Sequence, residues 1–164
     1  REGSTLSDEE EHQLIYEVVG KRAKRRTMHL LEQMDRTEQQ LREKLKQGGY
    51  PQACIDLALE YVKSFHYVDD YRYACTYINY RQDRMSRYQL KVKLYGKGVP
   101  GEVIDRALEE CYEGDEQEQI IRLLEKKKFD AQNSDQKEFP RVYQYLMRRG
   151  FRSNDVLRAM KSKQ

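Results

Sequence analysis

The sequence predicts an all-α fold: an elongated solenoid of three tandem three-helix repeats, each helix-turn-helix-like, with an N-terminal helical extension. Two observations support this prediction. A template of apolar residues and glycine recurs three times along the 164 residues, and charged residues (36%) nearly match hydrophobic residues (38%) in number. That balance suits stacked helical repeats, because each unit buries one stripe and leaves much charged surface in water.

The template is anchored on three glycines, Gly49, Gly98 and Gly150, which lie 49 and 52 residues apart. Each glycine follows a leucine by four residues, and another apolar residue precedes that leucine by four more. Six, nine and ten residues after each glycine come a β-branched residue, an alanine, and a leucine or methionine. A period of about 50 residues is typical of tandem supersecondary units. The template residues at the last two offsets are Ala58, Ala107, Ala159, Leu59, Leu108 and Met160. The residues expected to be buried in the core are Leu41, Leu45, Ile55, Leu90, Leu94, Ile104, Val142, Leu146 and Val156.

The first helix of a repeat is clearest in the middle repeat. It is expected to start at Asp69 or Asp70 and to run to about Arg84, because carboxylates before an apolar-periodic segment commonly cap a helix. Its buried stripe is expected to contain Ala74, Tyr77, Ile78 and the stem of Arg81.

The second helix of a repeat opens with a capping box. Ser86 precedes Gln89 by three residues, and Thr37 precedes Gln40 in the same way, so each pair can satisfy two amides at a helix N-terminus. The template glycine is expected to end this helix with a positive φ, which glycine adopts most easily. A proline two residues after each of the first two glycines then suits the first position of the third helix.

These signals divide the chain into an N-terminal extension, residues 1–20, and repeats over residues 21–67, 68–114 and 115–164. The boundaries follow from the template period, since each repeat contains one template glycine between its second and third helices.

The extension and the last repeat add their own features. Residues Leu6–Val19 are expected to form an amphipathic helix, which Gly20 separates from the first repeat. In the last repeat Ser153 is expected to cap the third helix, and Pro140 falls in the first turn of the second, where proline is tolerated. The polar segment 130–137 is expected to be a loop.

Composition and cysteine spacing narrow the class of protein. No apolar run has the length of a membrane span, and residues 1–5 lack the basic start and apolar core of a signal peptide. The three cysteines, Cys54, Cys75 and Cys111, are widely spaced and each falls in a helical pattern. We expect buried, reduced thiols and a cytoplasmic protein.

No motif of an enzyme is present. The sequence has no phosphate-binding loop, no nucleophile elbow and no His/Cys cluster with metal-ligand spacing. His12, His29 and His66 are isolated, and the adjacent carboxylates of Asp69 and Asp70 suit helix capping better than acid–base catalysis. We expect a non-enzymatic protein without a cofactor.

Charge is segregated along the chain. Residues 81–97 contain six bases and one acid, residues 102–118 contain eight acids and one base, and residues 141–163 are basic again. Arg87 and Lys91, four residues apart, share one face of their helix. Repeated basic clusters favour a polyanionic or acidic partner. The residues expected to bind it are Arg25, Arg26, Arg84, Arg87, Lys91, Lys97, Arg148, Arg149 and Arg152.

Three other interpretations of this charge remain. Each basic cluster can be an ordinary solvated helix face without a binding role. The bases can pair with acids of the next helix, such as Glu102 or Glu109, and brace the repeat. Alternatively, the third helix of each repeat could enter a DNA groove. That role is disfavoured in the first two repeats, whose third helices present acids that phosphate repels. Only the third helix of the last repeat presents residues that suit DNA contact, namely Asn154, Arg158, Lys161 and Lys163.

Three segments resemble the RecX family. Thr37–Leu45, followed by Gly49-Tyr50, is similar to its Ser-x-x-Glu-Leu-x-x-Lys-Leu…Lys-Gly-Tyr pattern. Tyr67–Ala74 (Tyr-Val-Asp-Asp-Tyr-Arg-Tyr-Ala) is similar to its Tyr-Leu-Asp-Asp-x-Arg-Phe-Ala, the most specific of the three matches. Arg148–Arg152 resembles its C-terminal Arg-Arg-Gly-Phe segment. The matches follow the family's order, with Gln40 in place of the usual glutamate and Gly48 in place of lysine.

The resemblance implies a regulator of the RecA recombinase. Members of the family are curved arrays of three-helix units that bind the RecA–DNA filament and inhibit its ATPase, strand-exchange and coprotease activities. We therefore expect a monomer that binds the RecA nucleoprotein filament, with weak contact to single- or double-stranded DNA and none to membranes. Two alternatives stay open: a helical-repeat protein that binds nucleic acid directly, and a helical-repeat adaptor for another partner.

Overall fold

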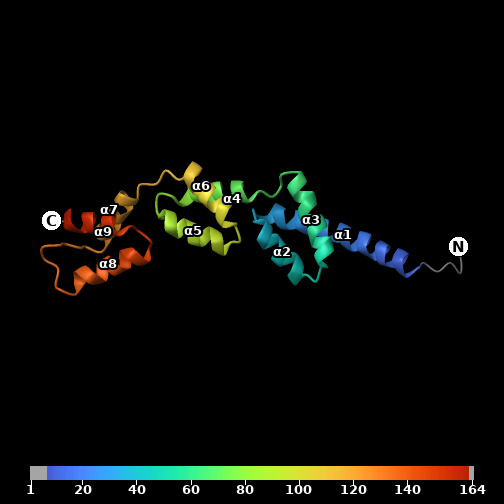
Figure 1. Cartoon of the computed structure of the whole chain (residues 1–164), viewed down its shortest axis with the longest axis horizontal. Helices are drawn as coiled ribbons and strands as arrows, with labels where there is room; N and C mark the ends of the chain where they lie inside the picture. The colour runs from blue at the N-terminus through green and yellow to red at the C-terminus, as the bar shows by residue number, and fades with distance from the viewer. Residues whose placement is uncertain (1–6, 163–164) are drawn as a thin grey trace. The chain divides into compact units, whose positions relative to one another are not determined.

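The computed structural model describes residues 7–162, and all regular secondary structure in this part of the chain is helical (Figure 1). The expected helix start at Leu6 and the C-terminal residues 163 and 164 lie outside the described residues. The nine helices of the described part are α1 (Asp8–Gln33), α2 (Glu38–Gln47), α3 (Gln52–Ser64), α4 (Asp70–Arg81), α5 (Arg87–Gly96), α6 (Gly101–Cys111), α7 (Glu116–Lys126), α8 (Glu138–Arg148) and α9 (Ser153–Ser162).

These helices belong to two compact units. The first unit contains α1, α2, α3, the first turn of α4 and the turn Lys97–Val99. The second unit contains the rest of α4 together with α5 to α9.

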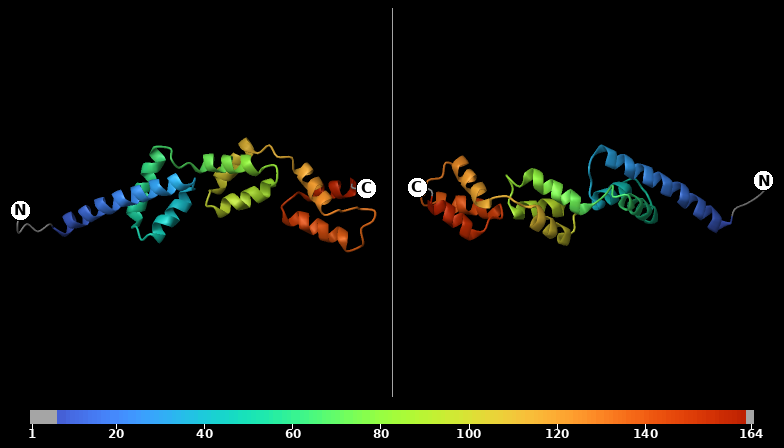
Figure 2. Two further views of the ribbon diagram at one scale, coloured as in Figure 1. Left: turned by 180° about the vertical axis from the view of Figure 1, so that it is seen from behind. Right: turned by 90° about the horizontal axis from the view of Figure 1, so that it is seen from above.

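In the first unit α1 packs along α3, and α2 lies against both (Figure 2). Leu30 of α1, Leu41 and Leu45 of α2, and Ile55 and Leu59 of α3 are each at most 2% exposed and form its core. The N-terminal half of α1 continues beyond α2 and α3 (Figure 2).

In the second unit α5 packs on α6, and α9 packs on both α7 and α8. Ile120, Leu124, Leu146, Val156 and Met160 form the core of α7, α8 and α9, each with no exposed surface. All nine template residues expected in the core are buried, with at most 6% of their surface exposed. The six residues at the ninth and tenth template offsets are buried as well. The repeat template therefore predicts the core correctly.

The capping boxes and turns are also confirmed. Thr37 and Gln40 form a reciprocal capping box at α2. Ser86 and Gln89 do the same at α5, with N–H to oxygen distances of 3.3 and 3.2 Å. The three template glycines have φ angles of 83°, 88° and 85°, in the left-handed region that side chains disfavour.

The expected break at Gly20 is wrong. α1 runs through Gly20 without interruption to Gln33. Gly20 is buried, and a Cβ there would lie 3.7 Å from Leu57 Cδ1 of α3, so packing against α3 offsets the roughly 1 kcal/mol by which glycine weakens a helix. The N-terminal segment is thus the first half of the first repeat's long helix, and the described residues form nine helices instead of ten.

α4 is shorter than expected and buries less of its surface. It ends at Arg81, not near Arg84. Ala74 and Ile78 are fully buried as expected, but Tyr77 is half-buried. The Arg81 guanidinium lies 3.9 Å from the centroid of the Tyr77 ring, so this pair forms a cation–π contact at the edge of the core.

The starts of the third helices differ from the expectation by one position. Pro51 and Pro100 are N-caps of α3 and α6, one residue before the first helical position. Ser153 is the first residue of α9 and not its cap; its hydroxyl lies 2.8 Å from the Tyr143 hydroxyl.

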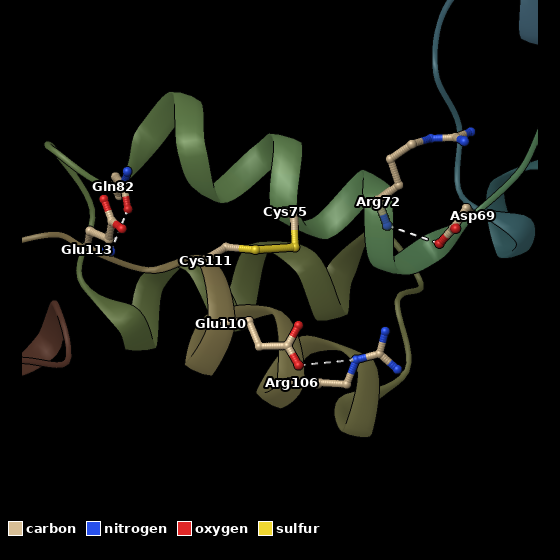
Figure 3. The surroundings of a disulfide bond; sticks show 8 residues. All are labelled: Asp69, Arg72, Cys75, Gln82, Arg106, Glu110, Cys111 and Glu113. Carbon is tan, nitrogen blue, oxygen red and sulfur yellow. Dashed lines mark hydrogen bonds and ion pairs between the residues drawn. A yellow bond between two sulfur atoms is a disulfide. The ribbon is translucent and has the colours of Figure 1, made fainter.

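Two of the three cysteines are not free thiols, contrary to the expectation. Cys75 of α4 and Cys111 of α6 form a disulfide, with their Cα atoms 5.8 Å apart (Figure 3). The sequence conceals this pair because the two residues are 36 positions apart and only the packing of α6 on α4 brings them together. Cys54 is a buried free thiol, as expected, and its burial raises the pKa of the thiol.

Candidate interaction surfaces

Residues at the N-terminus of α2 form hydrogen bonds with residues of the second repeat. This set of contacts is here called the α2 joint. The Thr37 hydroxyl accepts the Gln40 N–H at 3.1 Å and donates to the Lys97 carbonyl at 2.6 Å. The Glu38 N–H donates to Asp70 Oδ1 at 3.0 Å. The hydroxyl of Thr37 is fully buried and uses both its donor and its acceptor capacity.

The second unit repeats this arrangement at the N-terminus of α5, here called the α5 joint. The Ser86 hydroxyl accepts the Gln89 N–H at 3.2 Å and donates to the Arg149 carbonyl at 2.9 Å. The Arg87 N–H donates to Glu116 Oε1 at 2.8 Å. Each joint therefore combines a capping hydroxyl, a carbonyl next to a template glycine, and the first carboxylate of the next repeat's first helix.

The glycine of each joint lies directly against the preceding repeat's second helix. A Cβ on Gly98 would collide with the Cβ and Cγ of Gln39, and a Cβ on Gly150 would collide with Tyr88. A Cβ on Gly49, by contrast, would meet nothing within 4 Å. Gly98 and Gly150 are thus required for close approach as well as for their backbone conformation.

Electrostatics at the α2 joint are set by burial. Asp70 is half-buried, and desolvation raises the pKa of its carboxyl group, although the hydrogen bond from the Glu38 amide acts in the opposite direction. Nearby, Glu38 is paired with Arg42 at 3.1 Å and with Lys63 at 3.2 Å. The sequence offered no signal for Asp70 or Glu116 as joint residues, since both look like ordinary first-turn acids.

The candidate binding bases divide between the two units. Arg25, Arg26 and Lys97 belong to the first unit, and the other six belong to the second. Arg25 and Arg26 are exposed on α1. Lys97 lies in the turn whose carbonyl joins Thr37, and its side chain is half-buried.

Arg87 and Lys91 are exposed on α5, but both make contacts within the unit. Lys91 Nζ lies 2.7 Å from Asp105 Oδ1 of α6, and the Arg87 guanidinium lies 4.9 Å from the centroid of the Tyr112 ring. An ion pair between α5 and the acidic helix α6 therefore exists as anticipated, but its acid is Asp105 and not Glu102 or Glu109. The first unit has its equivalent, in which Arg42 of α2 binds Asp56 of α3 at 2.7 Å.

The remaining candidates surround the end of α8 and the residues before α5. Arg148 and Arg152 are exposed, and Arg149 is half-buried with its guanidinium 4.8 Å from the Tyr145 ring centroid. Arg84 is exposed beside Asp83, at 3.8 Å. Because Ser86 bonds the Arg149 carbonyl, the α5 joint brings the Arg87 region next to the α8–α9 turn.

Sequence reasoning missed an aromatic cluster at the end of α3. Tyr61, Phe65 and Tyr67 are 38%, 53% and 47% exposed, and their rings contact each other in succession. The only signal in the sequence was the close spacing of these three aromatic residues after Ala58.

Within residues 7–162 no three potential metal-binding side chains come together. In the same part of the chain, none of the helices combines the length and apolarity needed to cross a bilayer.

Comparison with known proteins gives matches along most of the chain. Models of the first, second and third three-helix domains of RecX match residues 23–61, 69–108 and 114–160. Each model match includes one template glycine. The repeat boundaries proposed from the sequence stay predictions, because these matches leave the residues between them unassigned.

Several curated relatives, each named regulatory protein RecX, are similar to the chain. The relative from Caldanaerobacter subterraneus subsp. tengcongensis is 29% identical over 161 residues, covering 97% of the chain and 79% of the relative. The Trichlorobacter lovleyi relative is 36% identical over 138 residues, covering 81% and 89%. The Geobacillus kaustophilus relative is 32% identical over 155 residues, covering 92% and 57%. The chain thus spans little more than half the length of the last relative.

Two solved structures share the fold. A crystal structure of regulatory protein RecX aligns with a TM-score of 0.78 at 22% identity, covering 98% of this chain and 80% of that one. The crystal structure of RecX from Lactobacillus salivarius aligns with a TM-score of 0.72 at 16% identity, covering 87% and 95%. With its tandem three-helix domains and its matches to all three family models, the chain belongs to the RecX family of non-enzymatic regulatory proteins.

Proposed function

We propose that the protein binds the RecA–DNA filament and inhibits the recombinase, ATPase and coprotease activities of RecA, and thereby modulates DNA repair and the SOS response. Membership of the RecX family is the observation that carries this proposal. The protein is expected to act as a cytoplasmic monomer, without a cofactor.

The charge distribution of the second unit supports a polyanionic or acidic partner. Arg148 and Arg152 lie exposed at the α8–α9 turn, and the α5 joint places that turn next to Arg87. Cations at such a surface accelerate encounter with a filament that carries DNA, and their effect weakens as salt screens the charge. Lys91 contributes less, because Asp105 already pairs with it.

The test is the DNA-stimulated ATP hydrolysis of RecA, measured with increasing amounts of the protein. The expected result is a dose-dependent fall in the rate. The Arg148→Glu/Arg152→Glu variant should need a higher concentration for the same inhibition, and Lys126→Glu/Lys137→Glu, which makes the same charge change at exposed positions of the same unit, should inhibit like the wild type.

A rate of hydrolysis that is unchanged at all concentrations would overturn the proposal. Equal loss of inhibition in both charge-reversal variants would remove the α8–α9 turn from the binding surface. Thermal unfolding of each variant, measured alongside, separates loss of binding from loss of fold.

A further inference from the structure

One surface of the first unit combines basic side chains with exposed aromatic rings. Lys21, Lys24, Arg25 and His29 of α1, with Met28 and Tyr61, line a hollow of about 430 Å³. Glu32 is the one acid among its lining residues. Within residues 7–162, neither Lys21 nor Arg25 pairs with a carboxylate.

The aromatic side of this surface is a short ladder of rings. The Tyr61 and Phe65 ring centroids are 5.0 Å apart, and those of Phe65 and Tyr67 are 5.7 Å apart with planes only 17° from parallel. Lys24 Nζ lies 5.1 Å from the Tyr61 centroid, so the cations and the rings form one continuous surface. Tyr61 and Tyr67, at the two ends of this series, are 38% and 47% exposed to solvent.

The combination of cations and aromatic rings on this surface distinguishes between the partners that could bind there. An apolar protein surface would match the rings but would strip water from three cations without compensation. An acidic peptide would match the cations but would gain little from the partly exposed aromatic rings. Single-stranded nucleic acid matches both, because its phosphates pair with Lys and Arg while its bases stack on aromatic faces.

We propose that this surface, formed by Lys21, Lys24, Arg25, Tyr61, Phe65 and Tyr67, binds single-stranded nucleic acid without sequence preference. The cations of α1 hold two or three successive phosphates, and a base stacks on the outer face of the ring ladder. This proposal goes beyond the proposed function and does not rest on it, since it requires no RecA.

The phosphate contacts are tested with a fluorescent single-stranded oligonucleotide of mixed sequence, whose anisotropy is followed at several salt concentrations. Each phosphate contact contributes about 0.7 to the slope of log affinity against log salt for single strands. Lys24→Gln/Arg25→Gln should therefore lower the slope by about 1.4. Lys44→Gln/Lys46→Gln, which removes two exposed charges from α2 of the same unit, should leave the slope unchanged.

The stacking contact is tested separately. An oligonucleotide with abasic positions keeps every phosphate, and it should bind about 5- to 150-fold more weakly if one base stacks on the ladder. Because the chain has no tryptophan, Tyr67→Trp introduces a single reporter, whose emission should be quenched by the intact oligonucleotide and not by the abasic one.

Two results would overturn the proposal. Equal binding of the intact and abasic strands, with no quenching of Trp at position 67, leaves only an electrostatic contact and excludes the stacking site. If Lys24→Gln/Arg25→Gln leaves oligonucleotide binding unchanged but weakens binding to a polyglutamate peptide, the surface recognises acidic protein segments. Neither result depends on RecA inhibition, so failure here is distinct from failure of the proposed function.

Discussion

The α2 joint makes a quantitative prediction about Gly98. Both Gly49 and Gly98 have positive φ, of 83° and 88°, so alanine at either position loses about 1–2 kcal/mol from the left-handed backbone. A smaller gain of about 0.4–1 kcal/mol comes from the lower entropy of the unfolded chain. Gly49→Ala should therefore lower the free energy of unfolding by about 1 kcal/mol.

Gly98→Ala adds a second penalty. The new methyl group would meet the Cβ of Gln39 and lie 2.6 Å from its Cγ. Gln39 is in the first turn of α2, so its Cβ moves only if the helix itself shifts. Forcing atoms into a packed contact costs about 1–3 kcal/mol, and the total loss should be about 2–4 kcal/mol.

Urea denaturation of the two variants tests this reasoning directly. Gly98→Ala should lose about 1–3 kcal/mol more than Gly49→Ala, and Gln39→Gly should recover part of the difference in a double-mutant cycle. Equal losses at the two glycines would refute the joint as a stabilising contact. They would leave the backbone conformation as the only role of Gly98.

Three further predictions follow from other contacts. Ser86→Asp keeps a capping oxygen but cannot donate a hydrogen bond to the Arg149 carbonyl, so it should lower the free energy of unfolding by about 1–3 kcal/mol. If Ser86 acted only as a helix cap, urea denaturation would show little change. Reduction of the Cys75–Cys111 disulfide, which spans 36 residues, should lower the free energy of unfolding by about 4 kcal/mol. If the denaturation curves with and without dithiothreitol coincide, the disulfide does not stabilise the fold. Because the folded-state pKa of Asp70 is raised, the folded protein binds this proton more tightly than the unfolded chain, so its contribution falls as pH rises through the range just above the ordinary Asp pKa of about 3.9. Asp70→Asn should therefore gain stability relative to the wild type as pH rises through that range, and a constant difference across pH would contradict the assignment.

Much of the fold could be predicted because the template repeats. A leucine that recurs at the same offset in three units signals burial far more strongly than any single leucine, and Leu45, Leu94 and Leu146 are all fully buried. The capping boxes were equally predictable, since Thr37 and Ser86 each lie three residues before a glutamine. Local chemistry of this kind depends only on neighbours along the chain.

The contacts that could not be predicted join residues far apart in the sequence. Thr37 meets Lys97 across 60 residues, and no local pattern shows that the capping hydroxyl also donates. The same holds for the disulfide. Gly20 was misjudged because local propensity marks glycine as a helix breaker, while packing against α3 keeps the helix continuous.

The candidate binding bases were the least predictable part. Exposure could be inferred from helical phase, and Arg87, Arg148 and Arg152 are exposed. Whether a base is free or braced depends on the partner helix, as Lys91 and Asp105 illustrate. The aromatic ladder of the first unit was missed because its rings come from a helix end and a turn, where no periodicity applies.

Binding to the assembled filament tests the central claim most directly. RecA filaments formed on single-stranded DNA with a non-hydrolysable nucleotide are sedimented with the protein, and bare DNA at the same concentration serves as the reference. We expect the protein to sediment with the filament in a saturable, salt-sensitive manner. Arg148→Glu/Arg152→Glu should weaken this binding, and Lys126→Glu/Lys137→Glu should not. If the protein stays in the supernatant with filament present, at salt concentrations where it is folded, it does not bind the RecA–DNA filament and the proposed function is wrong.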